Sequence, residues 1–360
     1  MKFFDKNKKR DGKMRDISEI DKNLKVETEI KKDGLRFYDI KQEPFKVYGV
    51  FHDGERYRRM PDDVAKTVSD AIHYGVKYTA GGRVRFRTNS SFVAIHYKGE
   101  MGKMPHFAFT GSCGFDLYFG NTYVGSFVPP MGNNKGYESL IDLGDSEMKE
   151  VTINFPTYSF VEELYIGVDE NAHIEAPTPY RIEKPVVYYG SSITQGGCSS
   201  RPGSCYEPYI TRRFDCDHIN LGFSGSARAE DEMAEYIAGL DMSMFVYDYD
   251  HNSPSIEHLT ATHERMFKII REKNPDLPVI MMSRPKYHLD STEEKRLEII
   301  KKTYENAKAA GDKNVYFIDG RDLCRLCGNE GTVDNCHPTD FGFASMAQTL
   351  GDFIEENGLL

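Results

Sequence analysis

The sequence predicts two parts of different fold class, an antiparallel β-sandwich followed by a doubly wound α/β domain. Short segments that alternate polar and apolar side chains fill residues 24–178, a pattern typical of antiparallel strands with one buried face. Beyond residue 183, strand-like runs alternate with amphipathic helical patterns, which is typical of a parallel sheet covered by helices. Two prolines within residues 176–179 favour an extended connector. We therefore expect domains at 24–178 and 183–360, after a polar, loosely ordered lead-in at 1–23.

Several strands of the first part are predicted from their period of two. Residues 83–87 and 93–98 both alternate, with turn residues between them, so the pair is predicted to form a hairpin with one buried face. Arg83, Arg85 and Arg87 are expected on its solvated face. Further strands are expected at 115–119, 122–127, 151–155 and 164–168. Only residues 61–72 have a helical pattern in this part.

The second part is predicted to contain five strands separated by helices, and the apolar run at 185–189 is typical of a strand buried on both faces. The strands are expected at 185–190, 217–222, 244–249, 278–283 and 315–319. Apolar residues fall largely on one helical face within 256–270 and again within 343–354. A regular alternation of strand and helix predicts a doubly wound parallel sheet.

Charge and hydropathy exclude some classes of partner. The 360 residues include 56 acidic and 46 basic side chains, with a net charge of -10, which argues against a nucleic-acid partner because phosphates require a basic face. No stretch approaches the roughly 18 apolar residues needed to cross a bilayer, and the N-terminus has no apolar signal-peptide core. We expect a cytoplasmic protein that does not contact membranes; an oligomer is possible.

The seven cysteines are an odd number in a chain without a recognisable signal peptide, which favours free thiols. Cys198 and Cys205 flank a loop, and their oxidation state is left open. Cys324 and Cys327 form a single CxxC without a second pair or a histidine at metal spacing, so a zinc site is not expected there.

Polar residues that suit ester hydrolysis follow the predicted strands of the second part. Ser192, Gly225 and Asn252 follow the first three strands, and Asp334 and His337 follow the fifth. Such strand ends meet at one edge of a sheet. A serine nucleophile requires a base, a group that orients the base, and donors for the oxyanion, and these residues supply each type.

Simpler roles exist for every one of these residues. Ser192 could only cap a helix, Asp334 and Asn252 could only stabilise turns, and His337 could lie in a surface loop. Gly225 could be required for a positive φ angle, a role compatible with amide donation. The combination and order of the residues favour the catalytic interpretation.

The four blocks resemble those of the SGNH hydrolases, also called the GDSL esterase/lipase superfamily. Residues 190–193 (Gly-Ser-Ser-Ile) are similar to the family's Gly-Asp-Ser-Leu block, with Ser191 where aspartate is more usual. Asn252 follows Asp250 and His251 and thus departs from the usual Gly-x-Asn-Asp form. The resemblance implies the catalytic residues Ser192, Asp334 and His337, and an oxyanion hole of Ser192, Gly225 and Asn252.

The first part carries its own resemblance. Residues 114–118 (Gly-Phe-Asp-Leu-Tyr) are similar to the Gly-x-Asp-Leu-Tyr signature of a β-rich domain that precedes some SGNH esterases. Those proteins resemble carbohydrate esterases that remove acetyl groups from plant polysaccharides. The resemblance implies a jelly-roll-like sandwich before a three-layer α/β/α SGNH domain, a substrate such as an acetylated manno-oligosaccharide, and no metal or organic cofactor.

Substrate contacts are expected from His251, Tyr249 and Tyr206, which lie near predicted strand ends. No apolar lid insertion is evident, which favours a short acyl group. A lipid or aryl ester hydrolase on the same machinery remains an alternative, as does a non-catalytic carbohydrate-binding protein.

Overall fold

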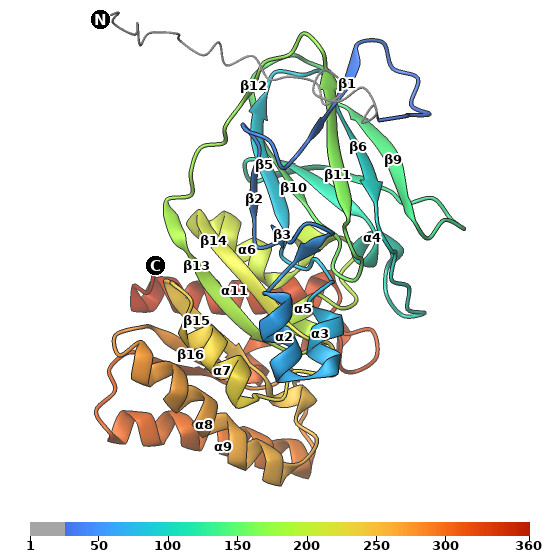
Figure 1. Cartoon of the computed structure of the whole chain (residues 1–360). Coiled ribbons are helices and arrows are strands. Elements are labelled where there is room, and N and C mark those ends of the chain that lie inside the picture. Colours follow the sequence, from blue (N-terminus) through green and yellow to red (C-terminus); the bar gives the residue numbers. More distant parts are fainter. Residues whose placement is uncertain (1–25) are drawn as a thin grey trace, which may run out of the picture.

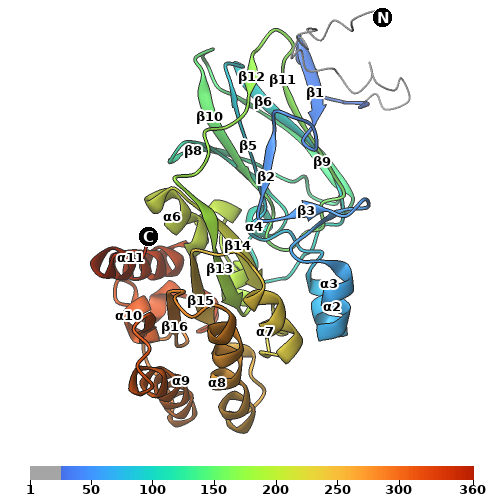
Figure 2. The same cartoon turned by 60° about the vertical axis from the view of Figure 1, so that its left-hand side comes forward.

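The computed structural model describes residues 26–360; the predicted lead-in at 1–23 lies outside the described residues. A β-sandwich stacks on one end of a three-layer α/β/α part, and the connector runs along one side (Figures 1 and 2). The predicted fold class is confirmed. In the described residues, no helix combines the length and apolarity that a bilayer crossing demands.

The sandwich consists of two antiparallel sheets that face each other across an apolar core. One sheet has the strand order β1-β11-β6-β9, and the other has β12-β5-β10-β7-β8 with β2 paired to β5. The strands are β1 (Leu35–Asp39), β2 (Lys46–Tyr48), β5 (Arg83–Thr88), β6 (Phe92–Lys98), β7 (Phe115–Phe119), β8 (Thr122–Phe127), β9 (Gly136–Asp142), β10 (Lys149–Asn154), β11 (Glu163–Asp169) and β12 (Ile174–Glu175). The short pair β3 (Phe51–His52) and β4 (Tyr57–Arg58) and the helix α4 (Phe109–Ser112) complete this part.

The predicted hairpin of 83–87 with 93–98 is wrong. β5 pairs with β10, β2 and β12, whereas β6 pairs with β11 and β9 in the opposite sheet. Each strand buries its apolar side chains in the same core, Val84 and Phe86 from one side and Val93 and Ile95 from the other. The alternation of polar and apolar residues therefore predicted both strands but not their partners. A strand can bury its apolar face equally well beside its neighbour in sequence or in the opposite sheet of a sandwich.

The predicted helix at 61–72 is divided in two. α2 (Asp62–Val68) ends at Ser69, whose extended backbone interrupts the helix and whose side chain then accepts a hydrogen bond from Ile72 N to cap α3 (Asp70–Gly75). Ala65 and Ile72 are buried in the same apolar cluster as Val187 of the parallel sheet. Although α2 and α3 belong to the first half of the chain, they pack beside α7 of the second (Figure 1).

The second half contains one parallel sheet with the order β14-β13-β15-β16-β17. All five predicted strands are present: β13 (Ile182–Gly190), β14 (Cys216–Gly222), β15 (Met244–Asp248), β16 (Val279–Met282) and β17 (Val315–Ile318). The helices are α5 (Ser192–Gln195), α6 (Tyr206–Phe214), α7 (Asp231–Ala238), α8 (Ile256–Lys273), α9 (Ser291–Ala309), α10 (Gly320–Leu323) and α11 (Asp340–Asn357), with short 3-10 turns η2 (Pro202–Ser204), η3 (Asp250–Asn252) and η4 (Gly328–Gly331).

Helices cover both faces of this sheet. α6 and α11 pack on the face that presents Val186 and Tyr188, and α7, α8 and α9 pack on the face that presents Val187 and Tyr189. Since β14 and β15 lie on either side of β13, the strand order reverses direction at β13. Ligands of open α/β sheets bind beyond the carboxyl ends of the strands at such a point.

The two halves meet along an interface that buries side chains predicted to be solvated. Arg83 and Arg85 are 1% and 6% exposed, so the expected solvated face is wrong for both residues. Arg83 forms an ion pair with Asp217, donates from Nε to the Tyr180 hydroxyl at 2.8 Å, and lies at the boundary of β14. The polar face of β5 is covered because the α/β part packs against it, a contact that a local strand pattern does not encode.

All seven cysteines are free thiols, as predicted, and Cys198 and Cys205 are not bridged.

Candidate active site

Ser192 lies at the turn from the central strand to a short helix. β13 ends at Gly190, and the Ser191 hydroxyl accepts a hydrogen bond from Ile193 N at 3.1 Å, which caps α5. Ser192 is thus the first residue of α5, and Gly196 ends that helix with a φ of 92°. The amide of the first helical residue has no acceptor within its own helix, so Ser192 N is available to a ligand.

A chain of hydrogen bonds joins Ser192 to two residues that are far away in the sequence. Ser192 Oγ lies 2.8 Å from His337 Nε2, and His337 Nδ1 lies 2.7 Å from Asp334 Oδ2. If the carboxylate accepts from Nδ1, the proton of the neutral ring is on Nδ1 and Nε2 is a free acceptor. The geometry then lets the Ser192 hydroxyl donate to Nε2, which is the arrangement required for proton removal from a nucleophile.

A tight loop before α11 holds the carboxylate against the ring. Asp334 Oδ1 accepts hydrogen bonds from His337 N at 2.7 Å and from Cys336 N at 3.1 Å. Burial opposes ionisation of Asp334, but these bonds, the bond from Nδ1 and the nearby His337 charge outweigh it and lower the pKa of the carboxyl. Asn335 has a φ of 64°, an angle that asparagine tolerates better than most residues. The three-residue spacing therefore brings carboxylate and imidazole together, as the sequence suggested.

The loop after β14, which contains Gly225, lies against Asn252 of η3, the turn that follows β15. Gly225 has a φ of 69°, and the Asn252 amide donates from Nδ2 to Phe223 O at 2.8 Å. One N–H of Asn252 is used in this bond and the second is left for another acceptor. The structure thus brings the second and third blocks side by side, and their roles as oxyanion donors stay predictions.

Two family profiles match the chain. The profile of the GDSL-like lipase/acylhydrolase family matches residues 183–355, and that of the N-terminal domain of SGNH hydrolase-type esterases matches residues 35–174. The chain belongs to the SGNH (GDSL-like) hydrolases. No curated protein sequence matches this SGNH hydrolase.

Solved structures of similar proteins support the two-part fold. A GDSL-like lipase from Bacteroides ovatus ATCC 8483 is 27% identical, with a TM-score of 0.81 over 89% of this chain and 97% of its own. A family two carbohydrate esterase from Clostridium thermocellum is 13% identical, with a TM-score of 0.61 over 88% of this chain and 99% of its own. An acetyl xylan esterase from the rumen bacterium Butyrivibrio proteoclasticus is 12% identical, with a TM-score of 0.59 over 91% and 99%.

The predicted substrate contacts of this SGNH hydrolase are partly wrong. Tyr206 and Tyr249 are both 0% exposed, so neither ring has surface to offer a substrate. The Tyr206 ring lies in the core against Phe343, and the Tyr249 hydroxyl bonds to His258 of α8 at 3.1 Å. An aromatic residue near a strand end is as typical of a core as of a binding pocket. Here both tyrosine rings lie in the core.

His251 lies beside the loop that carries the imidazole. Its Nδ1 is 3.7 Å from Cys336 Sγ, and burial together with the Arg284 charge lowers the pKa of His251 to about 4. The ring is therefore neutral near pH 7. A contact between His251 and substrate stays a prediction.

Residues of the first half also lie beside the candidate site of this SGNH hydrolase, and no sequence motif predicted them. The ring of Phe107 is 6.0 Å from that of His337 and 4.6 Å from that of Tyr158. The Tyr158 hydroxyl donates to Ser192 O at 3.4 Å, and Gln195 Nε2 donates to Thr157 O at 3.2 Å. These residues approach the site only because the two halves pack together, and no local sequence pattern predicts that packing.

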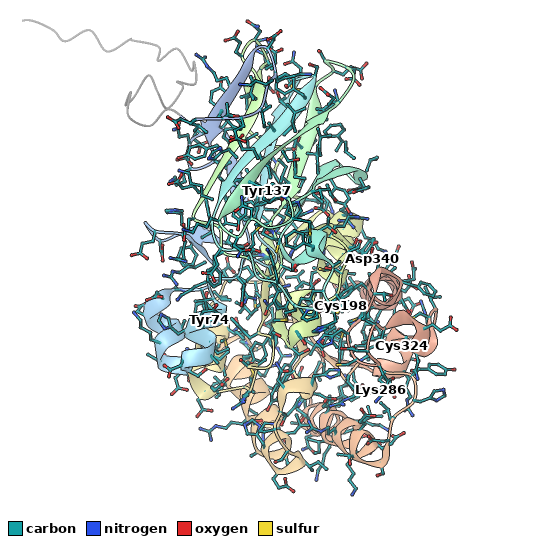
Figure 3. All side chains as sticks on the ribbon, turned by 90° about the vertical axis from the view of Figure 1, so that its right-hand side faces the viewer. Tyr74, Tyr137, Cys198, Lys286, Cys324 and Asp340 are labelled. Atoms are coloured by element: carbon teal, nitrogen blue, oxygen red, sulfur yellow. The ribbon has the colours of Figure 1, made fainter. Side chains whose placement is uncertain are left out.

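A cavity of about 430 Å³ opens next to the glycine loop. Aromatic side chains of the first half and the turn after β14 form its walls, and Gln195 of α5 joins them. The aromatic wall residues are Tyr74, Tyr78, Tyr158 and Phe223. Figure 3 places Tyr74 on the helices packed beside the α/β part, and Cys198 where the two parts meet.

Proposed function

We propose that this SGNH esterase removes acetyl groups from carbohydrates through an acyl-enzyme formed on Ser192. The single observation that carries the catalytic part is the hydrogen-bond chain Ser192–His337–Asp334, at 2.8 and 2.7 Å. Hydrogen-bond reach between nucleophile and base, and between base and carboxylate, is what the chemistry requires.

In the proposed first half-reaction, Ser192 Oγ attacks the ester carbonyl while His337 Nε2 takes its proton. Asp334 keeps the ring oriented and stabilises the imidazolium. His337 then returns the proton to the leaving sugar hydroxyl, and the acetyl group remains on Ser192. In the second half-reaction, water attacks the acyl-enzyme with His337 again acting as base.

The proposed oxyanion donors are Ser192 N, Gly225 N and the Asn252 side chain. Ser192 N is free of an intrahelical acceptor because of its position at the start of α5, and Asn252 retains one N–H beyond its bond to Phe223 O. Loss of one such donor typically costs about 3 kcal/mol of transition-state stabilisation.

The carbohydrate part of the proposal rests on two supports. The cavity beside the glycine loop has the exposed Tyr74 and the half-buried Tyr78 in its wall, and aromatic side chains suit sugar rings as well as acyl groups. Proteins of similar fold include a family two carbohydrate esterase and an acetyl xylan esterase.

The proposed domain boundaries are 24–178 for the sandwich and 183–360 for the hydrolase.

Acetate release tests this proposal directly. Acetylated mannan, acetylated xylan and simple sugar acetates should release acetate with the wild-type chain and not with Ser192→Ala. Absence of release from all three, from a folded wild-type chain, would refute the carbohydrate assignment.

A second candidate is a lipid or aryl ester hydrolase on the same residues, favoured by the size and aromatic walls of the cavity. A series of p-nitrophenyl esters separates the two: an optimum at acetate supports the first, and an optimum well beyond butyrate supports the second. A chain that turns over no ester and is not labelled by a fluorophosphonate would instead be a non-catalytic binding protein.

A further inference from the structure

Two further side chains that can bind metal lie beside the proposed base His337, and the proposed reaction uses neither of them. The ligand atoms of His106, Cys198 and His337 all lie within 4.8 Å of one another. They come from three separate loops, one between β6 and α4, one between α5 and η2, and one between η4 and α11. Two imidazoles and one thiolate form a donor set that zinc binds well.

The two additional ligands have few competing hydrogen bonds: the ring of His106 has none in the described residues, and the Cys198 thiol has one, to His106 O. His106 is exposed, and its ring forms no hydrogen bond with any residue among 26–360. The rings of His106 and His337 are 5.4 Å apart, and Cys198 Sγ lies 3.5 Å from His106 O. Cys198 has a φ of 71°, a left-handed conformation that is uncommon for residues other than glycine. Backbone conformations of this kind occur often at functional sites.

We propose that His106, Cys198 and His337 form a zinc site that inhibits the esterase. In a tetrahedral zinc complex, nitrogen and sulfur ligands lie about 3.4 to 3.7 Å apart, as follows from bond lengths of about 2.1 and 2.3 Å. The present atoms reach that spacing if side chains move by on the order of 1 Å, and His106 lies in a loop where its ring can rotate. Water occupies the fourth position.

Inhibition follows from the hydrogen bonds that His337 already makes. Nε2 is bonded to Ser192 Oγ, and Nδ1 is bonded to Asp334 Oδ2. Zinc on Nε2 removes the acceptor that takes the serine proton, and zinc on Nδ1 displaces the orienting carboxylate. Zinc–sulfur and zinc–nitrogen bonds form, the Cys198 thiol proton leaves to solvent, and no atom changes oxidation state. The ion is an inhibitor in this proposal and not a cofactor.

A second group of ligands is less suitable. Asp334, Cys336 and His337 also have ligand atoms within 4.8 Å of one another. Both Asp334 oxygens, however, already accept hydrogen bonds within the loop, from the His337 ring and from two backbone amides. Metal binding there would cost these bonds, whereas Cys198 and His106 give up almost none. Variants of the two cysteines therefore distinguish the two groups.

Cobalt(II) binding to the full-length chain tests the site without any reference to activity. Addition of Co²⁺ to the wild-type protein should produce thiolate-to-cobalt charge-transfer absorption, and Cys198→Ser should lose it. Cys336→Ser should keep it, as should Cys205→Ser, a buried cysteine outside both groups. Absorption that survives in Cys198→Ser, or that disappears in Cys336→Ser alone, overturns the assignment.

Zinc titrations test the consequence for catalysis, which rests on the proposed function. Half-inhibition by Zn²⁺ should require an at least roughly tenfold higher concentration in His106→Gln than in wild type, each measured against its own uninhibited rate. A chelator should restore activity. Equal inhibition of wild type, His106→Gln and Cys198→Ser overturns the inhibitory role. If no ester is hydrolysed at all, the proposed function fails, and the cobalt spectrum still decides whether the site exists.

Discussion

At the scale of single residues, the candidate site depends on how one carboxylate is held. Asp334 accepts hydrogen bonds on both oxygens, from the His337 ring and from loop amides. The charge thereby fixes which ring nitrogen carries the proton. The carboxylate of Asp340 has a structural role instead. It accepts a hydrogen bond from Ser200 N at 2.8 Å and so joins the loop after α5 to α11 (Figure 3).

Replacement of Asp334 by asparagine should remove most of the activity without unfolding the protein. An amide cannot fix the tautomer as a carboxylate does, and comparable changes in serine hydrolases lower kcat on the order of 10⁴-fold. Initial rates on p-nitrophenyl acetate measure the effect. Asp340→Asn is the control, because it makes the same change at a carboxylate outside the Ser192–His337–Asp334 hydrogen-bond chain. Nearly full activity in Asp334→Asn would remove this residue from the mechanism.

A second carboxyl links pH to stability. Burial, together with the Asp250 charge, raises the pKa of Asp248 to about 7. Between the usual carboxyl pKa near 4 and pH 7, the folded state binds a proton that the unfolded state lacks, so the contribution of Asp248 to stability falls as pH rises through this window. Its Oδ1 is buried without a partner, while Oδ2 accepts from the Thr194 hydroxyl at 3.2 Å.

Asp248→Asn should abolish this part of the pH dependence. Relative to wild type, the variant should gain on the order of 2 kcal/mol in free energy of unfolding between pH 5.5 and pH 8.5, since 1.5 pKa units at 1.36 kcal/mol each are no longer lost. Urea unfolding at the two pH values measures the difference. The same shift at both pH values would show that Asp248 does not titrate in this range.

At the scale of elements, the position of Ser192 depends on close backbone packing around α5. A Cβ atom on Gly222 of β14 would lie 2.2 Å from Gln195 N, and one on Gly190 would lie 2.2 Å from Asp248 O. Neither backbone contact can give way without movement of a strand or of α5. These two glycines set how closely α5, which carries the proposed nucleophile Ser192, approaches the sheet.

Gly222→Ala should therefore disturb both stability and catalysis. Overpacking of this kind typically costs about 1 to 3 kcal/mol, and the resulting shift of α5 should lower kcat for p-nitrophenyl acetate. Gly239→Ala is the control, because a Cβ there meets nothing closer than 3.4 Å and its backbone lies in the right-handed helical region. Equal thermal stability of Gly222→Ala and wild type would contradict the packing argument.

Elements were predictable from the sequence to the extent that their signals are local. The five parallel strands have local strand-like patterns, and the Asp334–His337 pair is close in sequence, so both could be inferred. Strand pairing in the sandwich could not, because β5 and β6 bury the same pattern in opposite sheets. The break at Ser69 was also missed, since its extended backbone interrupts an otherwise continuous helical period.

At the scale of the whole molecule, residues of both halves lie around the candidate site. Phe107 and Tyr158 of the first half pack near His337 and Ser192 of the second, and Arg83 of β5 pairs with Asp217 of β14. Contacts of this kind escape sequence reasoning because each partner looks ordinary in its own segment. Arg83 was accordingly predicted to be exposed, and it is among the most buried large side chains.

The Arg83→Met variant tests the interface. Removal of one partner from a buried ion pair leaves the other uncompensated and typically costs about 3 to 5 kcal/mol. Arg87→Met on the same strand is the control and should cost about 1 kcal/mol or less, because its side chain is 38% exposed and its ion pair is at the surface. Thermal unfolding of both variants gives the comparison, and similar losses would contradict a special role for Arg83.

The pairing of Arg83 with Asp217 also bears on how the protein is made. The two residues are 134 positions apart, and a ribosome that adds about 5 to 20 residues per second needs on the order of 10 s to polymerise the intervening chain. During that interval the Arg83 guanidinium has no Asp217 carboxylate to pair with. The interface between the sandwich and the α/β part therefore cannot form before β14 has been translated, and slow codons between these positions should lengthen the time for which this face of the sandwich is uncovered.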